Sequence, residues 1–120
     1  MATILLADDD AAVRDLVRRA LSAEGHTVHV TQDGLEALEF FNANGVPIDL
    51  LVTDVDMPQL DGISLAEKAL TAQSNLAVVL MSGFSDQLER AAGLRARRLL
   101  SIAKPFTLDQ IKQVLRTVLA

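Results

Sequence analysis

Several side chains that could do chemistry together follow closely after apolar segments of this sequence. They are Asp8, Asp9, Asp10, Asp54, Asp56, Ser82 and Lys104. If these side chains meet, the carboxylates repel one another and raise each other's pKa unless a cation compensates their charge. An all-oxygen ligand set with room for water suits a hard divalent cation such as Mg²⁺. The residue types therefore predict a Mg²⁺-binding acidic pocket.

The same residues also suit the transfer of a phosphoryl group. Lys104 adds a positive charge and Ser82 a hydrogen-bond donor, and this chemistry depends mostly on positioning and on neutralising charge. A carboxylate can itself be the nucleophile and become an aspartyl phosphate. Each residue alone has a simpler interpretation: Asp10 as a helix N-cap, Ser82 as part of a turn, Lys104 as a solvated cation. Their combination is what indicates a site.

Alternating strand and helix patterns are what would bring these side chains together. Strands are predicted at residues 3–7, 27–31, 48–53, 77–81 and 99–103. Helices are predicted around residues 13–21, from 34 to about 44, after Gly62 and from Thr107 onward, with the weakest helical pattern at 85–94. Such βα units imply a parallel sheet with right-handed crossovers and helices on both faces. Ligands bind outside the carboxyl ends of such strands, where the polar residues lie.

Composition narrows the class of protein. The 120 residues suffice for one domain, half of them are hydrophobic, and none is cysteine, which excludes disulfides and thiolate sites. The net charge of −5 with no Tyr or Trp argues against direct nucleic-acid binding. No apolar segment has the length of a membrane span, and the N-terminus turns acidic too early for a secretory signal. We expect a cytoplasmic protein, in which His26 and His29 are structural or surface residues.

The segments ILLADDD, LLVTDVDMPQLDG, VLMSG and AKPF resemble, in this order, the motifs of response-regulator receiver domains such as the chemotaxis switch CheY. The resemblance covers essentially the whole chain. It implies a doubly wound, five-stranded parallel α/β sheet of flavodoxin-like order 2-1-3-4-5. It also implies that Asp54 accepts phosphate from a sensor histidine kinase or a histidine phosphotransfer protein, as part of a two-component system.

The resemblance further assigns roles around Asp54. It implies that Asp9 ligates Mg²⁺ directly alongside Asp54, that Asp8 acts through water, and that the backbone carbonyl of Asp56 completes the protein ligands. Ser82 would bond a phosphoryl oxygen. Lys104 would pair with the phosphate or with Asp54, and Lys104–Pro105 is a candidate cis peptide bond.

The chain departs from the family pattern at the positions that transmit the signal. Relatives commonly carry Tyr or Phe where this chain has Ser101, so Phe84 is an alternative moving aromatic, beside a simpler packing or exposed role. Arg95, Arg97 and Arg98, together with Arg90, form a basic cluster. It is either a solvated helix end or a docking face for an acidic partner. Asp56, beside the acceptor, would tune the lifetime of the phosphoryl group.

Residues 1–120 are interpreted as a single receiver domain without an output domain, although a domain excised from a longer regulator would look similar. The output would then be a changed protein–protein interaction, as a monomer or a phosphorylation-dependent dimer. KPFTLDQI and Ser101 resemble the CpdR-like group, whose members act on regulated proteolysis, so the downstream protein would be protease machinery. The alternative is a phosphohydrolase of the haloacid dehalogenase type that uses Asp54 and Asp56. That family carries its DxD after the first strand, unlike this chain.

Overall fold

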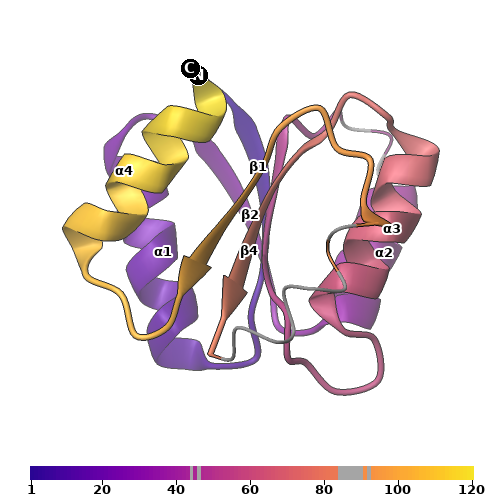
Figure 1. The fold of residues 1–120 in the computed structure, drawn as a ribbon, viewed down its shortest axis with the longest axis horizontal. Helices are drawn as coiled ribbons and strands as arrows, with labels where there is room; N and C mark the ends of the chain where they lie inside the picture. Colours follow the sequence, from indigo (N-terminus) through magenta and orange to yellow (C-terminus); the bar gives the residue numbers. More distant parts are fainter. Residues whose placement is uncertain (44, 46, 84–90, 92) are drawn as a thin grey trace.

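The computed structural model describes residues 1–43, 45, 47–83, 91 and 93–120, and strands and helices alternate along them (Figure 1). The strands are β1 (Thr3–Ala7), β2 (Thr27–Thr31), β3 (Leu50–Asp54), β4 (Ala77–Ser82) and β5 (Leu99–Ala103). The helices of the described residues are α1 (Ala11–Ala23), α2 (Gly34–Ala43), α3 (Gly62–Ala72) and α4 (Leu108–Leu119). The helix predicted at residues 85–94 falls mostly outside this part of the chain.

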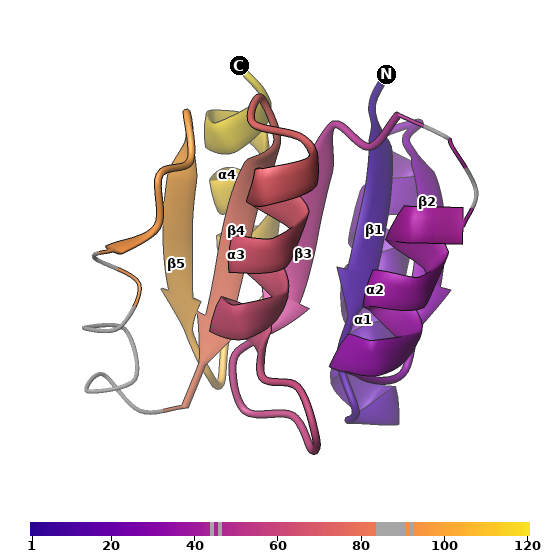
Figure 2. The same cartoon turned by 90° about the vertical axis from the view of Figure 1, so that its right-hand side faces the viewer.

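All five strands belong to one parallel sheet in the order β2-β1-β3-β4-β5. This confirms the predicted flavodoxin-like order. Figure 2 shows the strands side by side with their arrowheads pointing the same way, so their carboxyl ends form one edge of the sheet. Both chain termini lie toward the opposite edge (Figure 2).

Helices cover both faces of the sheet, with α1 and α4 on one side and α2 and α3 on the other (Figure 1). Alternate residues of β1 enter different cores: Ile4 and Leu6 pack in the core with α1 and α4, and Leu5 packs in the core with α2 and α3. Both cores are shielded from solvent, because β1, β3 and β4 are almost entirely buried. This explains why these strands read as continuous apolar runs and not as alternating ones.

The strands β3 and β4 differ slightly from the sequence-based boundaries. β3 begins at Leu50 and not at residue 48, because the side-chain amide of Gln73 bonds both backbone groups of Ile48 and replaces a neighbouring strand there. At the other end the ladder runs further than predicted, since Asp54 pairs with Met81 and Ser82 pairs with Ala103. Two polar residues of the predicted site are therefore parts of strands, which limits their movement.

Local signals set the starts of the helices. Asp10 caps α1 by accepting from the backbone N–H groups of Ala12 and Val13, as one interpretation of its sequence position predicted. Thr107 and Gln110 form a reciprocal capping box at α4. Among the residues that the structure describes, no helix combines the length and apolar character needed to cross a membrane.

Candidate functional site

The carboxyl edge of the sheet gathers polar side chains from four strands. Asp8 follows β1, Asp54 ends β3, Ser82 ends β4, and Lys104 follows β5. Asp8 is fully buried, and Asp54 and Ser82 are only 5% and 2% exposed, which is unusual for such groups unless they are paired. These four residues thus lie together at the edge predicted from their sequence positions.

The ammonium group of Lys104 bridges two carboxylates of this edge. Its Nζ lies 3.1 Å from Asp8 Oδ2 and 3.2 Å from Asp54 Oδ1. One positive charge therefore compensates two negative charges that come from separate strands. The peptide bond between Lys104 and Pro105 is cis, as expected.

A third carboxylate, that of Asp9, completes an acidic pocket. Asp8, Asp9 and Asp54 each offer one oxygen, and these oxygens lie within 4.8 Å of one another. Asp8 is held in this orientation because its Oδ1 accepts the backbone N–H of Asp10 at 2.8 Å. Asp9 is exposed, so the pocket opens to solvent on its side. An all-oxygen set of this size could hold a hard divalent cation.

The electrostatics of the pocket disfavour the charged carboxylates. Burial, and secondly the neighbouring Asp8 charge, raises the pKa of Asp54 to about 6, against the lowering effect of Lys104. Burial likewise raises the pKa of Asp8 above its usual range. Although burial alone would lower it, the pKa of Lys104 is raised because Asp8 and Asp54 favour its charged form. An added cation would relieve the remaining negative charge.

Replacement of Asp54 by the neutral isostere asparagine is expected to stabilise the fold at pH 7 in buffer without divalent cations. Because the folded pKa of Asp54 is raised to about 6, ionisation costs stability as the pH rises from about 4 to 6, up to about 3 kcal/mol. Asp54→Asn should gain about 1–3 kcal/mol at pH 7 and almost nothing near pH 4. Urea denaturation at both pH values measures the difference.

The matched control is Asp15→Asn on α1. The pKa of the exposed Asp15 is lowered, mainly because Arg18 donates a hydrogen bond to its carboxylate. Neutralising Asp15 should therefore not stabilise the fold. An Asp54→Asn protein no more stable than the wild type at pH 7 would show that the ionised Asp54 side chain is not penalised.

The loop between β3 and α3 packs tightly against the backbone of Asp54. Thr53 Oγ1 donates to the Asp54 carbonyl at 2.9 Å, and the N–H of Gly62 donates to the Val55 carbonyl at 2.9 Å. A Cβ atom at Gly62 would overlap the Asp54 carbonyl oxygen. From the sequence, Gly62 was expected only to precede the third helix, as the last residue of the segment LLVTDVDMPQLDG. A glycine opening a helix, where better helix formers are available, was the signal that could have revealed this contact.

The sequence matches the response regulator receiver domain family over residues 4–116. This chain belongs to the response-regulator receiver family. A receiver domain is a phospho-accepting switch of two-component signalling, phosphorylated by histidine kinases, and not a catalytic enzyme. The phosphohydrolase interpretation is therefore not retained.

Similar proteins support this assignment. Response regulator MprA of Mycobacterium ulcerans is 40% identical over 116 residues, which cover 97% of this chain and 49% of that protein. A receiver protein from Sinorhizobium medicae is 32% identical, with a TM-score of 0.85 over 98% of this chain and 94% of that one. TrrA of Thermotoga maritima, solved in complex with Mg²⁺-BeF, is 26% identical, with a TM-score of 0.82 over 98% and 99%. The receiver chain spans about half the length of the curated relatives it matches.

Two further residues singled out in the sequence, Asp56 and Ser101, have exposed side chains. Asp56 is exposed in the loop after β3, and Ser101 is exposed on β5 of the receiver.

The Arg98 guanidinium donates to the carbonyls of Val118 and Ala120 at the end of α4, so it has a structural role. Arg95 and Arg97 are exposed. Phe84 and Arg90 lie outside the described residues.

The two histidines have structural contacts, as expected. His26 Nδ1 accepts the backbone N–H of Ala2 at 3.0 Å, and the His29 ring packs against Phe40 with centroids 4.7 Å apart. Neither belongs to the carboxyl edge of the receiver sheet.

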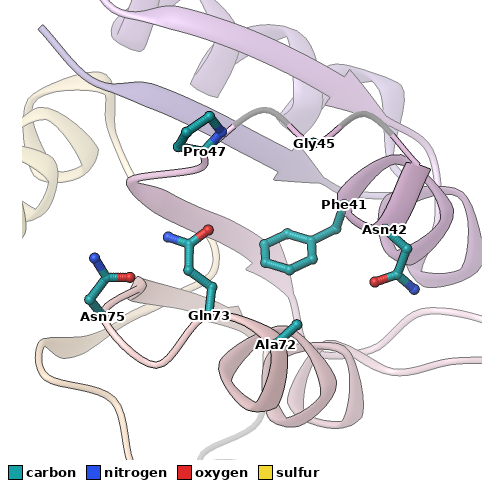
Figure 3. A pocket seen from close by; sticks show the side chains of 7 residues that line it. All are labelled: Phe41, Asn42, Gly45, Pro47, Ala72, Gln73 and Asn75. Carbon is teal, nitrogen blue, oxygen red and sulfur yellow. The ribbon is translucent and has the colours of Figure 1, made fainter.

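A hollow of about 480 Å³ lies at the opposite edge of the receiver sheet (Figure 3). Figure 3 shows the Phe41 ring and the Gln73 side chain facing each other across it, with Asn42 and Asn75 at its ends. No carboxylate or cation is among the described residues that line it. This hollow therefore lacks the charges of the pocket at Asp54.

Proposed function

We propose that Asp54 is the residue on which this receiver is phosphorylated, in a reaction that requires Mg²⁺. A carboxylate oxygen of Asp54 attacks the phosphorus of a phosphohistidine, the P–N bond breaks, and the imidazole nitrogen leaves with the electron pair. The product is an aspartyl phosphate. This acceptor site and its metal are supported by the acidic pocket and by the Mg²⁺-BeF complex of the relative TrrA.

The donor atoms fit Mg²⁺. They are carboxylate oxygens of Asp8, Asp9 and Asp54 within 4.8 Å of one another, and the backbone carbonyl of Asp56 is proposed as a further ligand. When bound, the ion neutralises charge on the phosphoryl oxygens. Asp9 is the proposed direct ligand alongside Asp54, and the buried Asp8 acts through water and through its contact with Lys104.

Lys104 and Ser82 are proposed to hold the phosphoryl group. The single observation that carries the proposal is the Lys104 ammonium at 3.2 Å from the Asp54 carboxylate, within a three-carboxylate pocket. From this position the ammonium group can stabilise the negative charge that develops on the phosphoryl oxygens. Ser82, which is 2% exposed at the end of β4, supplies a hydroxyl donor at the same edge.

Intact-mass spectrometry after incubation with acetyl phosphate and Mg²⁺ tests the acceptor. The wild type is expected to gain the mass of one phosphoryl group, and Asp54→Ala is expected to gain none. Asp56→Asn is the matched control, because it removes a nearby exposed carboxylate and should still be phosphorylated. A modified Asp54→Ala protein, or a wild type that stays unmodified with Mg²⁺ present, would refute the proposal.

The partners are proposed at a coarser level. The phosphoryl donor is a sensor histidine kinase or a histidine phosphotransfer protein, and the setting is the cytoplasm. The output is a changed protein surface, in a CpdR-like role toward protease machinery, with Arg95 and Arg97 as exposed cations that favour an acidic partner. Pull-down of partner proteins with and without the beryllium fluoride mimic, by the wild type and by the Arg95→Glu/Arg97→Glu variant, tests whether this surface binds the partner.

A further inference from the structure

Arg14 connects helix α1 to the acidic pocket. Its guanidinium Nη1 donates to the backbone carbonyl of Asp8 at 2.8 Å, and its own backbone N–H donates to the Asp10 carbonyl at 2.9 Å. The side chain is half-buried. One residue of α1 thus contacts both ends of the segment Asp8-Asp9-Asp10.

The Asp8 carbonyl needs a donor from outside the sheet. The ladder between β1 and β2 ends with the pair Ala7 and Thr31, and one further bond joins the Asp8 N–H to the Thr31 carbonyl at 3.3 Å. Beyond Thr31 the chain turns toward α2, where Asp33 accepts the N–H of Glu36. β2 ends at Thr31 and does not continue beside Asp8, and the Arg14 guanidinium supplies a hydrogen bond to the Asp8 carbonyl in place of one from β2.

This bond fixes the orientation of the peptide unit between two of the pocket carboxylates. Because a peptide unit is planar, holding the Asp8 carbonyl also sets the Asp9 N–H and the position of the Asp9 Cα atom. The Asp8 side chain is held separately by the Asp10 N–H. Asp9 is exposed, so the direction of its side chain depends on this backbone and not on packing.

We propose that Arg14 is a positioning residue for metal binding, which holds the Asp8–Asp9 peptide so that Asp9 faces Asp54. The inference rests on the proposed function, because it takes Mg²⁺ as the ion bound by this pocket. According to this inference, the positively charged Arg14 strengthens Mg²⁺ binding, although its charge repels the ion. By charge alone, a guanidinium near a Mg²⁺ site weakens binding, so its removal would strengthen binding.

Isothermal titration with Mg²⁺ alone separates the two effects. Arg14→Met keeps an unbranched side chain and removes both the charge and the donor. It is expected to weaken Mg²⁺ binding about tenfold, the lower end of the effect of losing an outer-shell contact. Arg18→Met is the matched control, since it removes the same charge from the same helix, where Arg18 pairs with the exposed Asp15. It should leave the affinity within about twofold or strengthen it.

A second readout distinguishes positioning from general damage. If Arg14 acts only on the metal ligands, saturating Mg²⁺ should return the acetyl phosphate reaction of Arg14→Met to within about twofold of the wild-type rate. Thermal denaturation identifies a temperature at which both variants are folded, and the titrations are made at that temperature. Equal or tighter Mg²⁺ binding by folded Arg14→Met, or a rate that stays low at saturation, overturns the inference. A wild type that binds no Mg²⁺ overturns the proposed function as well, so the two failures are distinguishable.

Discussion

Gly62→Ala is expected to destabilise the protein by about 3 kcal/mol or more, because the added methyl group has no space. Its Cβ would overlap the Asp54 carbonyl oxygen, and it would lie 2.9 Å from the carbonyl carbon and 3.0 Å from Thr53 Oγ1. Two of these atoms are backbone at the end of a buried central strand, so relief requires a shift of β3 or α3. Either shift moves Asp54 relative to Lys104.

Urea denaturation of the purified variant measures this loss, and phosphorylation by acetyl phosphate measures the displacement of Asp54. Gly93→Ala is the matched control, because a Cβ there meets no described atom within 4 Å and its φ angle is ordinary. It should remain close to wild type in both measurements. A Gly62→Ala protein within about 1 kcal/mol of the wild type would mean that the loop after β3 yields easily.

Lys104→Met is expected to cost about 2–4 kcal/mol at pH 7 without divalent cations. The substitution keeps the unbranched apolar part of the side chain and removes the ammonium group that bridges Asp8 and Asp54. Two carboxylates with already raised pKa values then lie together without compensation. The loss should shrink as the pH falls, since protonation of either carboxylate removes the repulsion.

A double-mutant cycle identifies the cause of this loss. Asp54→Asn in the Lys104→Met background is expected to recover most of the stability, which makes the two substitutions strongly non-additive. Lys68→Met, at an exposed position of α3, is the control for loss of a lysine charge and should have little effect. Additive losses would show that the ammonium bridge is not what stabilises this edge.

The strand positions followed from local pattern, and only their ends needed the structure. Apolar runs predicted β1, β2 and β5 at the residues found. The start of β3 could not be predicted in this way, because Ile48 is as apolar as its neighbours. It leaves the ladder because Gln73, 25 residues away, bonds its backbone.

The site was predicted as a set of residues but not as a geometry. The positions of Asp8, Asp54, Ser82 and Lys104 after apolar runs placed them at one edge, since parallel strands end together. Their types already indicated phosphoryl chemistry with a hard cation. Arg14 could not be recognised as part of this site, because its contact is with a backbone carbonyl, which no residue type indicates. For Gly62 the only sequence signal was a glycine at the start of a helix.

The sequence by itself thus determined the fold class, the receiver family and the identity of the charged groups, since periodicity and motif order are properties of short segments. Only the tertiary structure decided how three adjacent aspartates divide their work: Asp8 is buried, Asp9 faces solvent and Asp10 caps α1. It also decided that Lys104 bridges two carboxylates, one of them 96 residues away. Burial and ion pairing depend on which distant segments meet, and this is settled by packing of the whole sheet.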